Sequence, residues 1–147
     1  MALTLYLKRL LSASTDGKGI KVVETDTPGT LIHTAVAGEI DMDELWLYAV
    51  NIDTSPVTLT IEWGTASPRP IVLAARSGLI QIIPGLALQN EQTVKAYASS
   101  ANVVIIDGFI NRISVSEETY NILLPGSDDK LLLPDSEDAL LDVGAGG

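Results

Sequence analysis

The sequence predicts an all-β protein whose strands form an antiparallel β-sandwich or barrel. Short apolar runs, several of them alternating with polar residues, recur with turn signals about every 8–12 residues, which is the pattern of such folds. No segment before Ser114 shows the sustained 3.6-residue periodicity of a helix. The chain has 147 residues and is 46% hydrophobic, so one domain with a sizeable core is expected.

The stretch from Glu44 to Trp63 is expected to form the centre of the fold, as two long strands joined by a tight loop into a hairpin. In residues 57–63 every second side chain is apolar, which places one face in a core and the other in water. Residues 45–52 are apolar on both faces, and such a strand is covered on both, by its own domain, a neighbouring subunit or another chain. This doubly apolar strand predicts a homo-oligomer, with a trimer favoured over a dimer.

The remaining strands are expected on either side of this central pair. Residues 3–8 alternate apolar and polar side chains, which favours a strand or an extended arm over a helix. Residues 64–70 are rich in Gly, Ser and Pro and predict a loop, and Pro84-Gly85 predicts a turn. Gly108, inside the last long strand, indicates a β-bulge or a close approach of two backbones. The other predicted strands are residues 20–24, 30–36, 70–75, 79–83, 86–88, 92–98 and 103–113.

The acidic charge is concentrated near the C-terminus. The formal net charge is −10, and residues 117–147 alone hold 8 acidic side chains and 1 basic one. This excess of acid argues against binding to nucleic acid, which needs clustered Lys and Arg. The expected organisation is an N-terminal arm with the first strands at residues 1–29, a β-sandwich body at 30–116 and an acidic, leucine-rich C-terminal arm at 117–147.

A nine-residue repeat marks the C-terminal arm, in which ILLPGSDDK is followed by LLLPDSEDA. A Pro in each unit disfavours a continuous helix, and two units are too few for a solenoid. The aliphatic triplets would be a solubility liability in water, so we expect an extended arm that docks onto a partner or another copy. The apolar N-terminal residues are expected to attach in the same way. The expected partner-binding residues are Leu3, Leu5, Leu7, Ile122, Leu123, Leu124, Leu131, Leu132 and Leu133.

No catalytic constellation is visible in the sequence, and we expect a protein that is not an enzyme. The absence of Cys excludes disulfides, thiolate catalysis and Cys-based zinc sites. The single histidine, His33, is expected to be structural, and Asp41, Asp43 and Glu44 are expected to be a solvated loop. No cofactor or metal is expected, since the spacing of the acidic residues in the arm matches no EF-hand, although Ca²⁺ binding there stays an alternative.

Neither a membrane span nor a signal peptide is expected. No window of the sequence approaches 18 consecutive apolar residues. The N-terminus has only six apolar residues before Lys8, and no basic region precedes them.

Three stretches together resemble small structural proteins of tailed-phage virions. They are DELWLYAVNIDTSPVTLTIEWG, PGLALQNEQTVKAYASSANVVIIDGFINRI and the leucine-rich acidic repeat. The type to which the chain is most similar is the capsid decoration, or cement, protein, over about residues 30–143. The resemblance implies a jelly-roll-like sandwich on the capsid surface of a bacteriophage virion. There a homotrimer or dimer would brace neighbouring major capsid subunits.

Two other functions stay open. The first is a component of the phage neck, tail or fibre base. The second is a carbohydrate-binding β-sandwich, which needs an exposed aromatic platform. Exposure of Trp46 or Trp63 beside Tyr97 would favour this second alternative.

Overall fold

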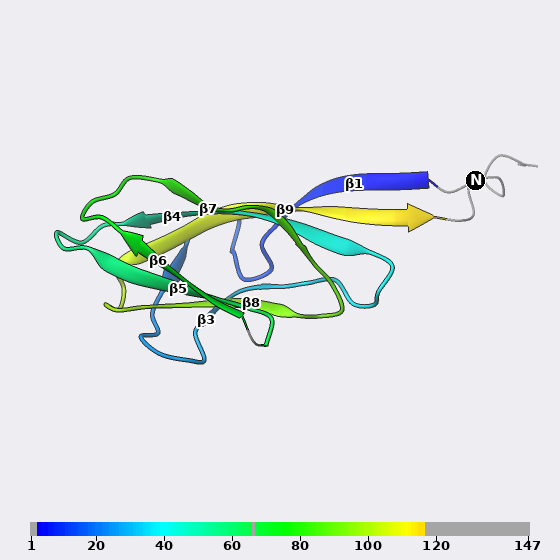
Figure 1. The fold of residues 1–147 in the computed structure, drawn as a ribbon. Helices are drawn as coiled ribbons and strands as arrows, with labels where there is room; N and C mark the ends of the chain where they lie inside the picture. The colour runs from blue at the N-terminus through cyan, green and yellow to red at the C-terminus, as the bar shows by residue number, and fades with distance from the viewer. Residues whose placement is uncertain (1–2, 66, 117–147) are drawn as a thin grey trace, which may run out of the picture. The chain divides into compact units, whose positions relative to one another are not determined.

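The computed structural model describes residues 3–65 and 67–116, and these form nine β-strands and no helix. The strands lie in two antiparallel sheets that pack as a sandwich (Figure 1), so the predicted all-β sandwich is confirmed. The strands are β1 (Leu3–Leu10), β2 (Ile20–Val22), β3 (Thr30–Thr34), β4 (Met42–Asn51), β5 (Val57–Trp63), β6 (Ser67–Leu73), β7 (Ile80–Leu88), β8 (Thr93–Ala98) and β9 (Val104–Ser116).

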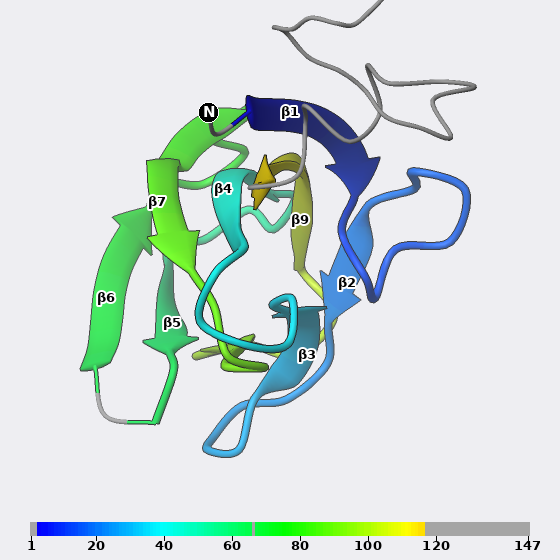
Figure 2. The same ribbon diagram turned by 90° about the vertical axis from the view of Figure 1, so that its right-hand side faces the viewer.

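One sheet has five strands and the other has four. The five-stranded sheet has the order β1-β9-β4-β7, and β2 also pairs with β9. Figure 2 shows β4 on one side of β9 and β2 on the other. The four-stranded sheet has the order β3-β8-β5-β6. β9 is therefore the strand around which the five-stranded sheet is assembled.

The core lies between the two sheets and follows from alternation along the central strands. In β4, Leu45, Leu47 and Ala49 are completely buried, whereas Trp46 and Tyr48 on the opposite face are only half-buried. The apolar residues of β5, β8 and β9 complete the core from both sides. Each fully buried Leu or Ile contributes roughly 1.5–3 kcal/mol to folding.

The predicted hairpin between residues 44 and 63 is wrong, although both of its strands exist. β4 pairs with β7 and β9 in one sheet, whereas β5 pairs with β6 and β8 in the other. The connection at residues 52–56 therefore passes from one sheet to the other. Buried Asn51 holds this crossing, because its side-chain amide donates to the carbonyl oxygens of Ser55 and Ala74. The same turn residues are found where two consecutive strands pair in one sheet and where they lie in two facing sheets, so they do not distinguish the two arrangements.

Two predicted breaks also lie inside strands. Residues 67–70 belong to β6, where Pro68 and Pro70 are tolerated because β6 is an edge strand. Pro84-Gly85 lies inside β7, where the register against β4 shifts before Trp46 and again after Leu47. Gly85 has a φ of +79°, and a Cβ there would lie 2.6 Å from the Trp46 ring. These residues therefore bend a continuous strand around an indole and do not end it.

The described residues divide into two units by their contacts. Leu5–Ser114 forms one compact unit, and it includes Leu11 and Val22, which are buried in the core. The other unit consists of residues 1–4 and 115–147, of which the structure describes Leu3, Thr4, Val115 and Ser116. The predicted C-terminal arm lies outside the described residues.

Gly108 makes the close backbone approach that the sequence indicated. The β4–β9 register runs without a shift, and a Cβ at Gly108 would collide with the carbonyl oxygen of Trp46. The Gly108→Ala variant is therefore expected to destabilise the body by about 3 kcal/mol in chemical denaturation.

Gly78→Ala is the matched control for this variant. A Cβ at Gly78 meets nothing within 4 Å, and only its φ of +75° opposes the change, at a cost of about 1 kcal/mol. Equal losses in the two variants would contradict the tight contact at Gly108.

Candidate functional site

The most exposed element of the described chain is β1. All eight of its residues are exposed, and this includes Leu5 at 44%, Leu7 at 48% and Leu10 at 54%. Its one partner among the described strands is β9, so its other edge has no ladder partner in that part of the chain. A long, apolar edge strand is a template for pairing with another chain. β1 is therefore the candidate docking element.

One end of β1 carries a cationic and aromatic surface. Lys8 Nζ lies 4.2 Å from the centroid of the Phe109 ring, within the range of a cation–π contact. Lys8, Arg9, Leu10 and Phe109 line a hollow of about 570 Å³. Phe109 is stacked with Trp46 at 6.3 Å between centroids. An apolar segment that also carries acidic side chains would match this surface.

Glu44 anchors the polar side of the same sheet face. Its Oε1 accepts hydrogen bonds from Trp46 Nε1 and Asn111 Nδ2, both at 3.0 Å. The hydrogen bond from Asn111 lowers the pKa of Glu44 most, and the bond from Trp46 lowers it further. The carboxylate therefore keeps Trp46 in place beside Phe109.

The structure describes only part of the predicted partner-binding set. Leu3, Leu5 and Leu7 lie together on β1, as the alternation predicted. Ile122, Leu123, Leu124, Leu131, Leu132 and Leu133 lie outside the described residues. The prediction omitted Tyr6, which is 67% exposed, and Leu10. Leu10 and Tyr6 lie on the opposite face of the strand from Leu5 and Leu7, so the alternation that selected those leucines did not select them.

A buried polar network lies elsewhere in the body. His33 on β3 and Asp43 on β4 are 2% and 0% exposed, and His33 Nε2 lies 2.8 Å from Asp43 Oδ2. Arg112 on β9 donates to both oxygens of Asp43, at 2.7 and 2.9 Å. The backbone N–H of Val36 donates to Oδ2 as well. The solvated loop predicted around Asp43 is therefore wrong, since β4 begins at Met42 and buries this carboxylate.

The hydrogen bonds of His33 define its tautomer. The backbone N–H of Ser12 donates to Nδ1 at 2.9 Å, so Nδ1 is an acceptor and Nε2 carries the proton that Asp43 accepts. Burial lowers the pKa of His33, and the nearby Asp43 carboxylate offsets only part of that effect. Burial would raise the pKa of Asp43, but the hydrogen bonds from Arg112 and His33 outweigh it and lower that pKa. The network is neutral histidine, carboxylate and guanidinium, and it joins strands of both sheets.

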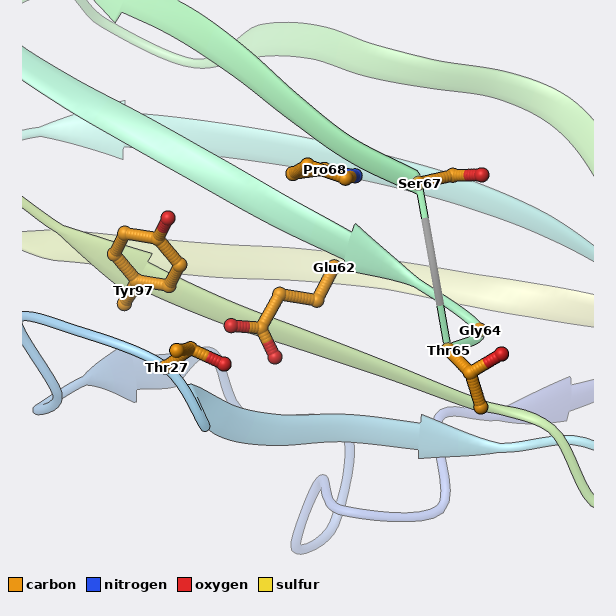
Figure 3. A pocket seen from close by; sticks show the side chains of 7 residues that line it. All are labelled: Thr27, Glu62, Gly64, Thr65, Ser67, Pro68 and Tyr97. Atoms are coloured by element: carbon orange, nitrogen blue, oxygen red, sulfur yellow. The ribbon is translucent and has the colours of Figure 1, made fainter.

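A shallow hollow of about 230 Å³ lies over the four-stranded sheet (Figure 3). The Glu62 carboxylate points between Thr27 and Tyr97 in this hollow. Glu62 Oε1 accepts from the backbone N–H of Gly29, and Oε2 is buried with no hydrogen-bond partner in the described part of the chain. Among the residues that line the hollow, the Glu62 carboxylate and the Tyr97 phenol are the groups that could take part in proton transfer.

The described residues contain no cluster of side chains typical of a metal site. No group of three or more metal-ligating side chains occurs among them, and no helix there is long and apolar enough to cross a membrane. Trp46 belongs to the five-stranded sheet and Tyr97 to the four-stranded one, while Trp63 packs against the core. Neither tryptophan therefore forms an aromatic platform with Tyr97.

Comparisons with protein-family models, with curated proteins and with solved structures found no match to this chain.

Because of the buried network, we expect the free energy of unfolding to decrease as the pH is lowered. The folded-state pKa of His33 is below its unfolded value of about 6.5, so the unfolded state binds the extra proton first. The contribution of neutral His33 to the free energy of unfolding is fully present above about pH 6.5. It falls as the pH decreases below this value, by at most about 1.4 kcal/mol per pH unit for one proton. Loss of the low-pKa Asp43 carboxylate adds to this only below about pH 4.

Thermal melts of the protein and of His33→Gln between pH 7 and 5 test this prediction. His33 is the only histidine, so the variant should be less stable at pH 7 and should have a flatter pH profile. An identical slope in both proteins would contradict the assignment.

Proposed function

We propose that this chain is a non-catalytic structural protein of a bacteriophage virion. In this proposal it decorates and stabilises the capsid by bridging neighbouring major capsid subunits. The observation that carries the proposal is β1, an exposed apolar strand with one unpaired edge among the described strands. A soluble protein keeps such an edge when another chain covers it in the assembled state.

The strand order supports a jelly-roll topology. From β3 onward the chain passes repeatedly from one sheet to the other. The four-stranded sheet receives β3, β5, β6 and β8, and the five-stranded sheet receives β4, β7 and β9. Strands that alternate between two sheets in this way are expected when two Greek keys form a jelly roll. Jelly rolls recur in viral capsid proteins and also in lectins, so topology alone does not choose between these classes.

The proposal includes a homo-oligomer, with a trimer favoured, and extended terminal arms that contact the major capsid protein. The half-buried outer face of β4, with Trp46 and Tyr48, supports further cover by another subunit. The same exposed strand also suits a neck, tail or fibre-base component, which would differ in copy number and not in chemistry.

Quantitative mass spectrometry of purified virions tests the proposal. A capsid decoration protein should be present in copies on the order of hundreds per particle, whereas a neck or tail component would have roughly 5 to 12. The Leu5→Ser/Leu7→Ser variant should reduce the copy number, because each change removes an exposed apolar contact without disturbing the core.

Val72→Ser is the matched control, since Val72 is 74% exposed on the edge strand of the other sheet. It should leave the copy number unchanged. Absence of the protein from the particles would overturn the virion assignment.

A further inference from the structure

We propose that β1 is the receptor for the C-terminal arm of a second copy of this chain. In this contact, residues 122–133 of one copy pair with the edge of β1 of the next copy that has no partner among the described strands, here called the free edge. The inference rests on the homo-oligomer that the proposed function includes, and it names the contact that holds the oligomer together.

The receptor side is defined by the exposure of β1 on both faces. Leu5 and Leu7 project to one face, whereas Tyr6 and Leu10 project to the other, and none of the four is less than 44% exposed. A strand added at the free edge would place its alternate side chains beside both sets. One added strand therefore covers apolar surface on two faces at once.

The arm carries the side chains that such a site requires. Each of its two triplets, Ile122-Leu123-Leu124 and Leu131-Leu132-Leu133, supplies three consecutive aliphatic residues, which point alternately to both faces of an extended strand. Pro125 and Pro134 follow the triplets and restrict the backbone before binding, which reduces the entropy lost on docking.

The charges of the two partners are complementary. β1 contains Lys8 and Arg9 and no acidic residue, and both line the hollow beside Phe109. Residues 117–147 hold 8 acidic side chains and 1 basic one. Because Lys8 and Arg9 are solvent-exposed, we expect these charges to favour the register and the rate of association, and the aliphatic contacts to supply most of the affinity.

The site and the arm differ from one another, so the contact is heterologous. Each copy then offers one arm and one receptor, and a closed ring satisfies all of them. A ring of three copies agrees with the proposed trimer. A symmetric contact between two β1 strands would instead use no arm and would give a dimer.

Mixing two full-length variants tests the exchange. One variant carries Leu5→Ser and Leu7→Ser and keeps its arm, and the other carries serine at all six triplet positions and keeps its β1. By light scattering at micromolar concentration the wild type should be an oligomer and each variant alone a monomer. An equimolar mixture should give a species of twice the monomer mass, because one intact arm meets one intact receptor.

Several results would overturn the proposal. They are a monomeric wild type, a triplet variant that stays oligomeric, and a mixture that stays monomeric. Thermal melts verify that both variants are folded. If either is not, a peptide of residues 119–135 should dissociate the wild-type oligomer while its scrambled version does not, and failure of that peptide would equally overturn the contact.

Two controls separate apolar from electrostatic docking. Val72→Ser should leave the oligomer unchanged. Asp128→Asn/Asp129→Asn/Asp135→Asn should raise the dissociation constant less than about threefold, whereas the triplet changes should raise it more than about tenfold. These measurements need no capsid, so their failure is distinguishable from absence of the protein in virions.

Discussion

The structure depends on the pairing of β4 with β9. Ten residue pairs join the two strands without interruption, from Met42 opposite Ile113 to Asn51 opposite Val104. Gly108 allows the two backbones to approach closely at the middle of this ladder. The alternation along both strands then places one face of the pair in the core.

The same register positions the polar and aromatic features. It sets Arg112 opposite Asp43, and so the carboxylate that binds His33 is neutralised where it is buried. It sets Phe109 opposite Trp46, and so the two rings stack on the outer face. Removing one member of the buried ion pair would leave an uncompensated charge, which makes a shift in register costly.

The fold class and most strands could be predicted from the sequence, because alternation and turn residues are local signals. Which strands pair could not, since that depends on contacts between distant residues. The connection after Asn51 has the composition of a hairpin turn, yet β4 and β5 lie in different sheets. Pro84-Gly85 has the composition of a turn, yet the bulky indole of Trp46 makes it a bend within β7.

The exposed strand β1 and the buried network around Asp43 could be predicted from the sequence to different extents. Leu3, Leu5 and Leu7 of β1 follow from their alternation with polar residues, whereas Leu10, on the opposite face of the strand, does not. The burial of Asp43 was not predictable, because the arginine that compensates it lies 69 residues away. His33 was expected to be structural, and its bonds to Ser12 and Asp43 describe such a role.

We propose that another chain covers β1 in the assembled protein. A strand with one paired edge has alternate amides that point toward the unpaired edge and exchange readily with solvent. Hydrogen–deuterium exchange, measured on the oligomer and on the monomer obtained by dilution, reports whether this edge is covered. If another chain covers β1, exchange in residues 3–10 slows at least about tenfold on assembly, while exchange in the exposed edge strand β6 is unchanged. Unchanged exchange in β1, with protection appearing at another surface, would contradict it.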